Sequence, residues 1–328
     1  LVQFSPQDEA VWITERQKFR AKAMGINFMD MCILLRGFPL HERYSYPAPN
    51  STLDPKTTLF LSTTESKANL EYFSSFRTWY CNSDTGKASS EWLYNKILSY
   101  TTELASDEQK ALITVEAFEH RWRQNSIIYP RLTPQNASDS DPLAIVGAHI
   151  DSANRKGPYL PAPGADDDGS GTATILEAYR ALLVVNYIPV SPSEFHFYAG
   201  EEHGLLGSRA IVAHYEAVGK AVRGMQQFDM TAWHRAGAPE EIALSGSDYQ
   251  ILLTERYLPA PADHGSWTRA GCQACHPLES RFRMRNPRAK LTHWSAGDRM
   301  DVSDEFSFDH MLQFSKLAVA FAAELSSC

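Results

Sequence analysis

Residues 143 to 151 read Leu143-Ala144-Ile145-Val146-Gly147-Ala148-His149-Ile150-Asp151, and this segment is the strongest indication of the fold. A short apolar run that is bounded by polar residues is typical of a buried β-strand. Two later apolar runs have the same form, one ending before Glu201 and Glu202 and the other before Asp229. Because ligands of open α/β sheets gather outside the carboxyl ends of the strands, we expect His149 and these carboxylates to lie together.

Regular patterns in the rest of the chain add helices around these strands. Helical spacing covers residues 9–26, 69–79, 87–100, 171–185, 204–218 and 306–325, and strand patterns also cover residues 111–118 and 126–132. Strands that alternate with helices are typical of α/β architecture. Residues 38–57 are rich in proline, serine and threonine, which predicts an extended linker.

The composition is that of an ordered globular protein. The chain has 328 residues, of which 43% are hydrophobic, and a net charge of −8 without a block of lysine or arginine. Nucleic-acid binders normally carry such a basic footprint, so we expect no nucleic-acid partner. No apolar run approaches the ~18 residues that would span a bilayer, so we expect no membrane partner.

Two features favour a secreted glycoprotein. The chain begins at Leu1 rather than at methionine, which is typical of a processed or truncated chain. The triplets Asn50-Ser51-Thr52 and Asn136-Ala137-Ser138 are acceptors for N-glycosylation. We therefore expect an extracellular location, with the vacuole as the alternative.

The cysteines leave two structural interpretations open. There are five of them, so at least one thiol is unpaired within a monomer. Cys272-Gln273-Ala274-Cys275-His276 matches the string that attaches c-type haem, but the match is only these five residues. We expect either a local disulfide or two free buried thiols there.

The polar residues at the predicted strand ends have ordinary explanations when they are taken singly. An acidic triplet at 166–168 could cap the following helix, and Glu201 with Glu202 could be an acidic first turn. Adjacent carboxylates repel one another, however, and a bound cation would relieve that repulsion. Imidazole and carboxylate form a ligand set suited to zinc, and Asp151 could orient a metal-bound His149. Groups of this kind at successive strand ends favour a metal site.

The region from His149 to Asp229 resembles the co-catalytic zinc aminopeptidases of peptidase family M28, and within it the leucyl aminopeptidases of fungi and bacteria. The likeness rests on Gly164-Ala165-Asp166-Asp167-Asp168-Gly169-Ser170-Gly171 and on Glu201-Glu202-His203-Gly204-Leu205-Leu206-Gly207-Ser208. It continues through 277–282 and 286–288 and back through 69–97, so it covers most of the chain. It implies a single α/β domain of the phosphorylase/hydrolase-like zinc exopeptidase type, with a mixed, mostly parallel central sheet flanked by helices.

The resemblance also implies a site that binds two Zn²⁺ ions and hydrolyses peptides with a free, apolar N-terminal residue. Carried over by position, the metal ligands are His149, Asp167, Glu202, Asp229 and His293, with Asp167 bridging the two ions. Glu201 would be the catalytic general base.

Two further aspartates would support this site. Asp151 would orient His149, and Asp168 would support an unusual turn in which the peptide bond between Asp167 and Asp168 is cis.

The substrate pocket implied by the resemblance is apolar, and the sequence departs from the family beside it. Met230, Leu278 and Phe282 fall at the pocket positions for the first side chain, and Arg285 replaces a residue that is usually aromatic. His293 follows an insertion of a few residues. The loop at 259–263 is shorter than in relatives, which carry a tyrosine there that helps the transition state.

The N-terminal region resembles the end of the family's propeptide. We expect residues 1–56 to be a prosegment-like arm and linker, as in a zymogen, and residues 57–328 to be the catalytic domain of a monomer. An ordinary N-terminal arm is the alternative.

Other activities remain open on the same ligand set. A glutaminyl cyclase would bind one zinc ion, and a carboxypeptidase would be another exopeptidase of the family. The shortened loop and the displaced His293 also leave room for an inactive binding homologue.

Overall fold

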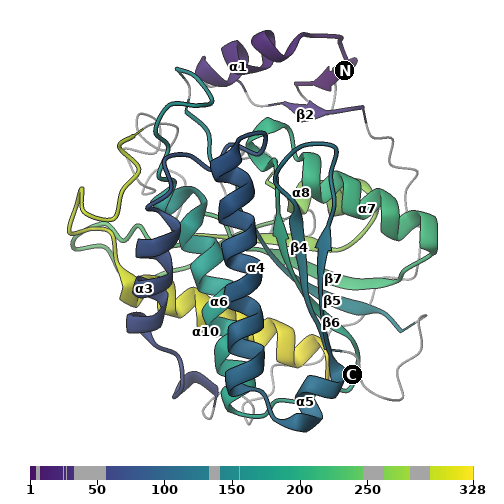
Figure 1. Cartoon of the computed structure of the whole chain (residues 1–328), viewed down its shortest axis with the longest axis vertical. Coiled ribbons are helices and arrows are strands. Elements are labelled where there is room, and N and C mark those ends of the chain that lie inside the picture. The colour runs from purple at the N-terminus through teal and green to yellow at the C-terminus, as the bar shows by residue number, and fades with distance from the viewer. Residues whose placement is uncertain are drawn as a thin grey trace.

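The computed structural model describes residues 1–4, 8–24, 26, 28–32, 57–132, 141–154, 156–246, 262–280 and 296–327. Its centre is a seven-stranded sheet between two layers of helices (Figure 1). The strands in chain order are β3 (Ile113–Phe118), β4 (Ser126–Leu132), β5 (Leu143–His149), β6 (Ser193–Tyr198), β7 (Val222–Gln227), β8 (Ala243–Gly246) and β9 (Ala274–Leu278).

The direction of the strands explains where a site can form. Across the sheet the order is β3-β4-β6-β5-β7-β9-β8, and the four strands β6, β5, β7 and β9 are parallel to their neighbours in this group. Antiparallel pairs add β4 and β3 at one edge and β8 at the other. The chain runs from β5 to β6 on one side and then to β7 on the other side, so the carboxyl end of β5 lies at a topological switch point.

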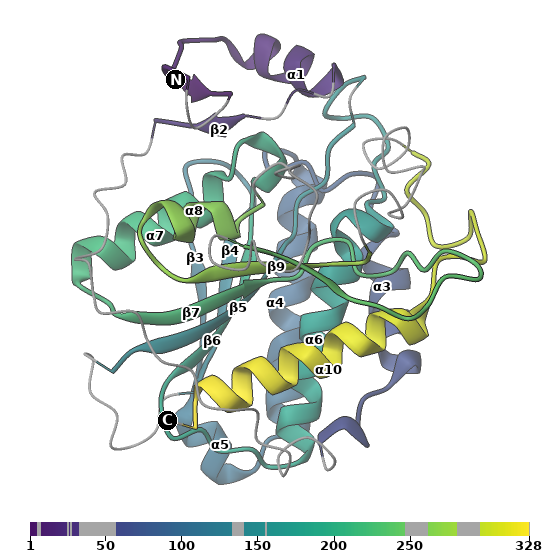
Figure 2. The ribbon, with the colours of Figure 1, turned by 180° about the vertical axis from the view of Figure 1, so that it is seen from behind.

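Helices cover both faces of this sheet (Figures 1 and 2). One face carries α3 (Thr63–Phe73), α4 (Asp84–Leu104), α6 (Gly171–Val184) and α10 (Phe308–Leu325), and the other carries α7 (Leu206–Val218) and α8 (His264–Arg269). A shorter helix, α5 (Asp107–Leu112), leads into β3.

Side chains alternate between these two layers along each central strand. On β5, Val146 and Ala148 pack with the larger core cluster around α6 and α10, whereas Ile145 packs with the cluster beneath α7 and α8. Phe197 and Tyr198 on β6 divide between the two clusters in the same way. Successive side chains of a strand point to opposite faces, so both faces of β5 are buried, and the segment of β5 before His149 is apolar throughout.

The N-terminal arm forms a small unit at one end of the molecule, drawn in purple in Figures 1 and 2. Its strands β1 (Val2–Gln3) and β2 (Met29–Asp30) pair antiparallel, and the helix α1 (Glu15–Ala23) lies between them in the chain. Val2, Ala21 and Phe28 form a small apolar cluster that is separate from the main core. The arm meets the main domain beside the carboxyl ends of the central strands, where Asp30 donates its amide to the Gly204 carbonyl at 3.1 Å.

The predicted α/β fold and most predicted elements are confirmed. The helix expected at 69–79 is wrong in its bounds, because α3 begins at Thr63 behind a Ser62 cap and ends at Phe73. The elements α5, α8 and β8 and the two arm strands were not predicted; each is six residues or shorter, too short for a clear periodic signal. The linker expected at 38–57 and both glycosylation triplets fall mainly or wholly outside the described residues. Among the described helices, none is both long and apolar enough to cross a bilayer.

Candidate metal centre

Three predicted ligands converge at the carboxyl ends of β5 and β7. Nε2 of His149, the last residue of β5, lies 3.0 Å from Oδ1 of Asp167 and 3.9 Å from Oδ1 of Asp229. One donor atom from each residue lies within 4.8 Å of the other two, and all three residues are buried. This arrangement of one imidazole and two carboxylates can hold a divalent metal ion such as zinc.

A second aspartate, Asp168, fixes the turn that carries Asp167 by accepting backbone hydrogen bonds. Oδ2 of Asp168 accepts the amide of His149 at 2.9 Å, and Oδ1 accepts the amides of Gly171 at 2.9 Å and Met230 at 3.2 Å. Asp168 therefore ties the turn to β5, to α6 and to the segment after β7. The peptide bond between Asp167 and Asp168 is cis, as expected from the family resemblance.

A residue that the sequence analysis missed fixes the other side of this turn. The two carboxylate oxygens of Asp298 accept the amides of Asp166 at 2.9 Å and Asp167 at 3.0 Å. Asp298 is 5% exposed and comes from a segment more than 130 residues later in the chain. No local pattern marks it, since its role depends entirely on the tertiary contact.

Asp151 connects the first strand end to the second. Its Oδ1 accepts the amide of Glu201 at 2.8 Å, and its Oδ2 accepts the amide of Glu202 at 3.2 Å. Nδ1 of His149 lies 3.0 Å from the Asp151 carbonyl oxygen and 3.5 Å from Oδ1 of its carboxylate. The side of His149 that faces away from Asp167 is therefore held by Asp151.

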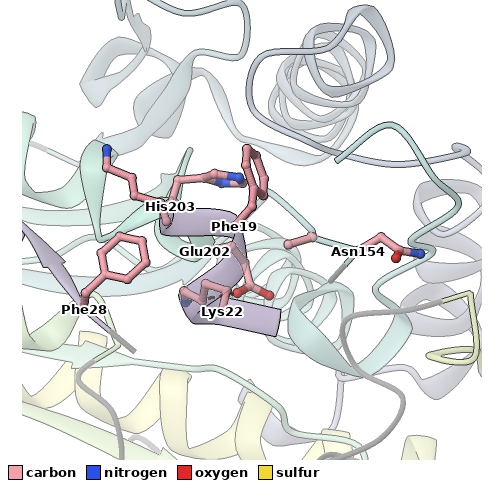
Figure 3. Close-up of a pocket in the computed structure, with 8 residues that line it drawn as sticks. Phe19, Lys22, Phe28, Asn154, Glu202 and His203 are labelled. Atoms are coloured by element: carbon pink, nitrogen blue, oxygen red, sulfur yellow. Dashed lines mark hydrogen bonds and ion pairs between the residues drawn. The ribbon is translucent and has the colours of Figure 1, made fainter. Parts of the chain in front are cut away.

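The carboxylate of Glu202 points toward the N-terminal arm (Figure 3). Its Oε2 lies 3.4 Å from Nζ of Lys22 on α1, and its buried Oε1 has no hydrogen-bond partner among the residues that the structure describes. An unpartnered buried carboxylate oxygen beside a cluster of donors fits a position that would face a metal ion. Lys22 and Phe19 of the arm line a cavity here together with Asn154, Glu202 and His203.

Burial and charge crowding perturb the carboxylates of the centre. Burial, with a contribution from Asp167, raises the pKa of Glu202 to about 8. Burial likewise raises the pKa of the half-buried Glu201 well above its usual range, against the opposing effects of Lys22 and His149. For Asp151, hydrogen bonds with His149 and His203 outweigh burial and hold its pKa below its usual range. Crowded carboxylates with raised pKa values are groups that a cation would stabilise in the ionised form.

A second group of possible donors lies beside the first, but it differs from the second ion site implied by the resemblance. Nδ1 of His203 lies 3.7 Å from Sγ of Cys81 and 3.5 Å from Oδ2 of Asp151. Both oxygens of Asp151 already accept the amides at the start of the Glu201 turn. We interpret this cluster as a hydrogen-bonded support for Asp151.

The remaining predicted site residues are only partly placed. Met230 and Leu278 are both 4% exposed, at the segment after β7 and at the end of β9, and neither lines the cavity beside Glu202. Phe282, Arg285 and His293 lie outside the described residues.

The Cys-x-x-Cys segment holds free thiols in the structure. Cys272 and Cys275 are both unpaired, which settles the alternative left open by the sequence in favour of two thiols.

Comparisons with known proteins find similar sequences and similar solved structures. The model of peptidase family M28 matches residues 128–248. Leucine aminopeptidase 1 of Metarhizium robertsii is 35% identical over 96% of this chain and 84% of its own length. Leucine aminopeptidase 1 of Coccidioides posadasii is 36% identical over 99% of this chain and 89% of its own length. Among solved structures, the LapA aminopeptidase of Legionella pneumophila superposes with a TM-score of 0.74 at 25% identity, covering 91% of this chain and 78% of LapA.

The fold and the metal centre together define a hydrolytic metalloenzyme of the α/β class. Within that class, the chain belongs to peptidase family M28. The predictions of the family, of the fold and of a metallopeptidase are thereby confirmed.

Proposed function

We propose that this protein is a zinc-dependent aminopeptidase that removes apolar, leucine-like residues from the free N-terminus of peptides. The observation that carries the proposal is the convergence of His149, Asp167 and Asp229 at the switch point of the sheet. The leucine aminopeptidases that match nearly the whole chain support the choice of reaction and of substrate class.

The residues present suit two zinc ions. His149 and Asp229 would hold one ion, Glu202 and His293 would hold the other, and Asp167 would bridge them. Bound zinc would lower the pKa of a water molecule and polarise the scissile carbonyl. The unpartnered Oε1 of Glu202 supports its place in this set.

Within this site Glu201 acts as the general base. Its carboxylate takes a proton from the attacking water and delivers it to the leaving amine, a role that requires a pKa moved toward neutrality. Burial moves the pKa of Glu201 in that direction. Asp151 holds the backbone of Glu201, and Asp168 holds the turn that carries Asp167. Both aspartates are therefore positioning residues and take no part in the reaction.

The substrate is a peptide with a free N-terminus. Met230, Leu278 and Phe282 would receive the first side chain, and Met230 and Leu278 are buried apolar residues near the ends of β7 and β9. Apolar pockets discriminate between apolar side chains by modest factors, so we expect a preference for leucine rather than an absolute requirement.

We also propose that residues 1–56 are a prosegment and that residues 57–328 are the catalytic domain of a secreted, monomeric enzyme. The separate apolar cluster of the arm supports this division, because the arm does not share the main core.

Hydrolysis of leucine p-nitroanilide tests the activity. We would assay the full chain with and without a zinc chelator, before and after limited proteolysis of the arm. Chelator-sensitive turnover that added zinc restores is the expected result. Absence of turnover from a protein with two bound zinc ions would favour an inactive homologue or a carboxypeptidase, and cyclisation of glutaminyl peptides with one bound zinc would favour a glutaminyl cyclase.

A further inference from the structure

A lysine of the N-terminal arm contacts Glu202, one of the proposed metal ligands. Lys22 lies in the last turn of α1, and its side chain is 13% exposed. Its ammonium group lies 3.4 Å from Oε2 of Glu202, whose side chain is 2% exposed (Figure 3). A buried ammonium needs a carboxylate partner, and here that partner is a residue proposed to bind metal.

Several contacts hold the arm in the position that brings Lys22 to Glu202. The ring of Phe19 packs edge-on against His203 and Tyr80, with centroids 5.5 Å and 6.0 Å away. Within the arm, Nζ of Lys18 lies 2.6 Å from Oδ2 of the buried Asp30, which ties α1 to β2.

The other end of the arm is tied to the main domain as well. The guanidinium of Arg269 donates to Oε1 of Gln3 at 2.7 Å and lies 3.4 Å from Sδ of Met29. The approach of Lys22 to Glu202 is therefore part of a docked interface and not the reach of a loose surface side chain.

We propose that the Lys22 ammonium takes the cation position at Glu202, so that docking of the arm and binding of metal by Glu202 weaken each other. The inference rests on the proposed function, because that function makes Glu202 a metal ligand. Both an ammonium and a metal ion require the negative charge of this carboxylate, and two cations at this spacing repel each other. The docked arm thus leaves the other metal position, at His149 and Asp229, as the one that fills first.

Reciprocity follows from this competition. If the docked arm weakens metal binding at Glu202, then metal at Glu202 weakens docking of the arm by the same factor. Zinc at high concentration should therefore loosen α1 from the main domain in the uncleaved chain.

Zinc binding to the full chain tests the competition directly. We would measure the affinities of the two zinc ions by equilibrium dialysis for the wild type, Lys22→Met and Lys22→Arg. Lys22→Met keeps the apolar stem of the side chain, whereas Lys22→Arg keeps its charge. We expect the weaker zinc to bind about tenfold more tightly to Lys22→Met, within the range usual for coupled ligands, and to be little changed in Lys22→Arg. Equal affinities in all three proteins would overturn the inference.

Hydrogen exchange of the α1 amides separates loss of charge from loss of docking. We expect zinc to speed exchange in the wild-type α1 and to have a smaller effect in Lys22→Met, while both zinc-free proteins show the same protection. Slow exchange that zinc does not change in the wild type would contradict the proposal. Lys67→Met is the control for a change of charge, because Lys67 lies on α3 in an exposed pair with Glu71.

A Glu202→Gln variant distinguishes this inference from the proposed function. If Glu202→Gln binds as much zinc as the wild type, the proposed ligand set itself is wrong. If Glu202→Gln loses one zinc ion but Lys22→Met binds zinc like the wild type, only the competition is wrong.

Discussion

Asp151 holds the backbone of Glu201 in place, because its Oδ1 accepts the Glu201 amide at 2.8 Å. The same carboxylate lies 3.5 Å from Nδ1 of His149, on the side of the ring that faces away from Asp167. One buried aspartate therefore sets the positions of a proposed metal ligand and of the proposed general base. The strand end that carries His149 and the turn after β6 are linked through this single side chain.

Replacement of Asp151 by asparagine tests this link. Asparagine keeps the size of the side chain but loses the charge and one of the two acceptor oxygens. Loss of a group that supports a metal ligand typically costs about 10–100-fold in metal affinity or activity, and we expect an effect of this size on both. Zinc titration and kcat/KM would measure it.

Asp301→Asn is the matched control for this variant. Asp301 forms an ion pair with Arg299 at 2.6 Å, and both side chains are exposed. The same substitution at Asp301 therefore removes an ion pair at the surface rather than a buried one. We expect the control to bind zinc and turn over substrate like the wild type. An Asp151→Asn protein that also behaved like the wild type would show that the amides of the turn do not need this carboxylate.

Glu201→Gln tests the general base. A glutamine cannot accept the proton, so we expect kcat to fall by about 10²–10⁴, the usual contribution of a general base. Zinc content should stay at the wild-type level, because Glu201 is not among the proposed ligands. Near-normal turnover would remove Glu201 from the mechanism, and a loss of zinc would make it a ligand instead.

The central strands and the residues at their ends could be predicted because both signals are local. His149 is the last residue of its own apolar strand, and the acidic turn at 166–168 precedes a helix with clear apolar spacing. Periodicity and motif spacing predict such segments even when the tertiary contacts are unknown. The geometry around Asp167 then follows from the switch point of the sheet.

Other parts of the site depend on contacts between distant segments, which no local pattern marks. Asp298 binds the amides of the acidic turn from more than 130 residues away, and Lys22 meets Glu202 from 180 residues away. In the sequence alone, Asp298 and Lys22 look like ordinary surface charges.

Gly171→Ala tests how tightly the acidic turn packs on its surroundings. A Cβ atom at Gly171 would collide with Oδ1 of Asp168 and with the carbonyl oxygen of Phe228. Overpacking of this kind typically costs about 1–3 kcal/mol, and here it would also displace the turn that carries Asp167. We expect a lower free energy of unfolding in urea together with weaker zinc binding.

Gly157→Ala provides the comparison for that variant. A Cβ atom at Gly157 would meet Leu160 at 3.6 Å, an ordinary van der Waals distance. We expect this protein to keep its stability within about 0.5 kcal/mol and to bind zinc normally. Equal stability of the two alanine variants would mean that the turn can move without cost.

The buried carboxylate of Glu194 on β6 should make the fold sensitive to acid. Nζ of Lys220 lies 2.9 Å from its Oε1, and Nε2 of His196 lies 2.8 Å from its Oε2. Burial alone would raise the pKa of Glu194, but His196, Lys220 and Tyr215 outweigh it and lower the pKa to about 2. A carboxylate whose pKa is lower in the folded state stabilises the fold above its unfolded pKa, and this contribution is lost as the pH falls toward its folded pKa.

Glu194→Gln removes this titration and so tests it. We expect the variant to be less stable than the wild type by about 1–3 kcal/mol at pH 7, because buried hydrogen bonds to a charged group are lost. The difference should shrink as the pH falls from about 4.5 toward 2, since the wild type loses its advantage over that interval while the variant has no carboxylate to protonate there. Urea unfolding of both proteins from pH 7 to pH 3 would measure the two stability curves. If the two curves stay parallel down to pH 3, the pKa of Glu194 is the same in the folded and unfolded chains. The ion pair with Lys220 would then contribute nothing to the acid sensitivity of the fold.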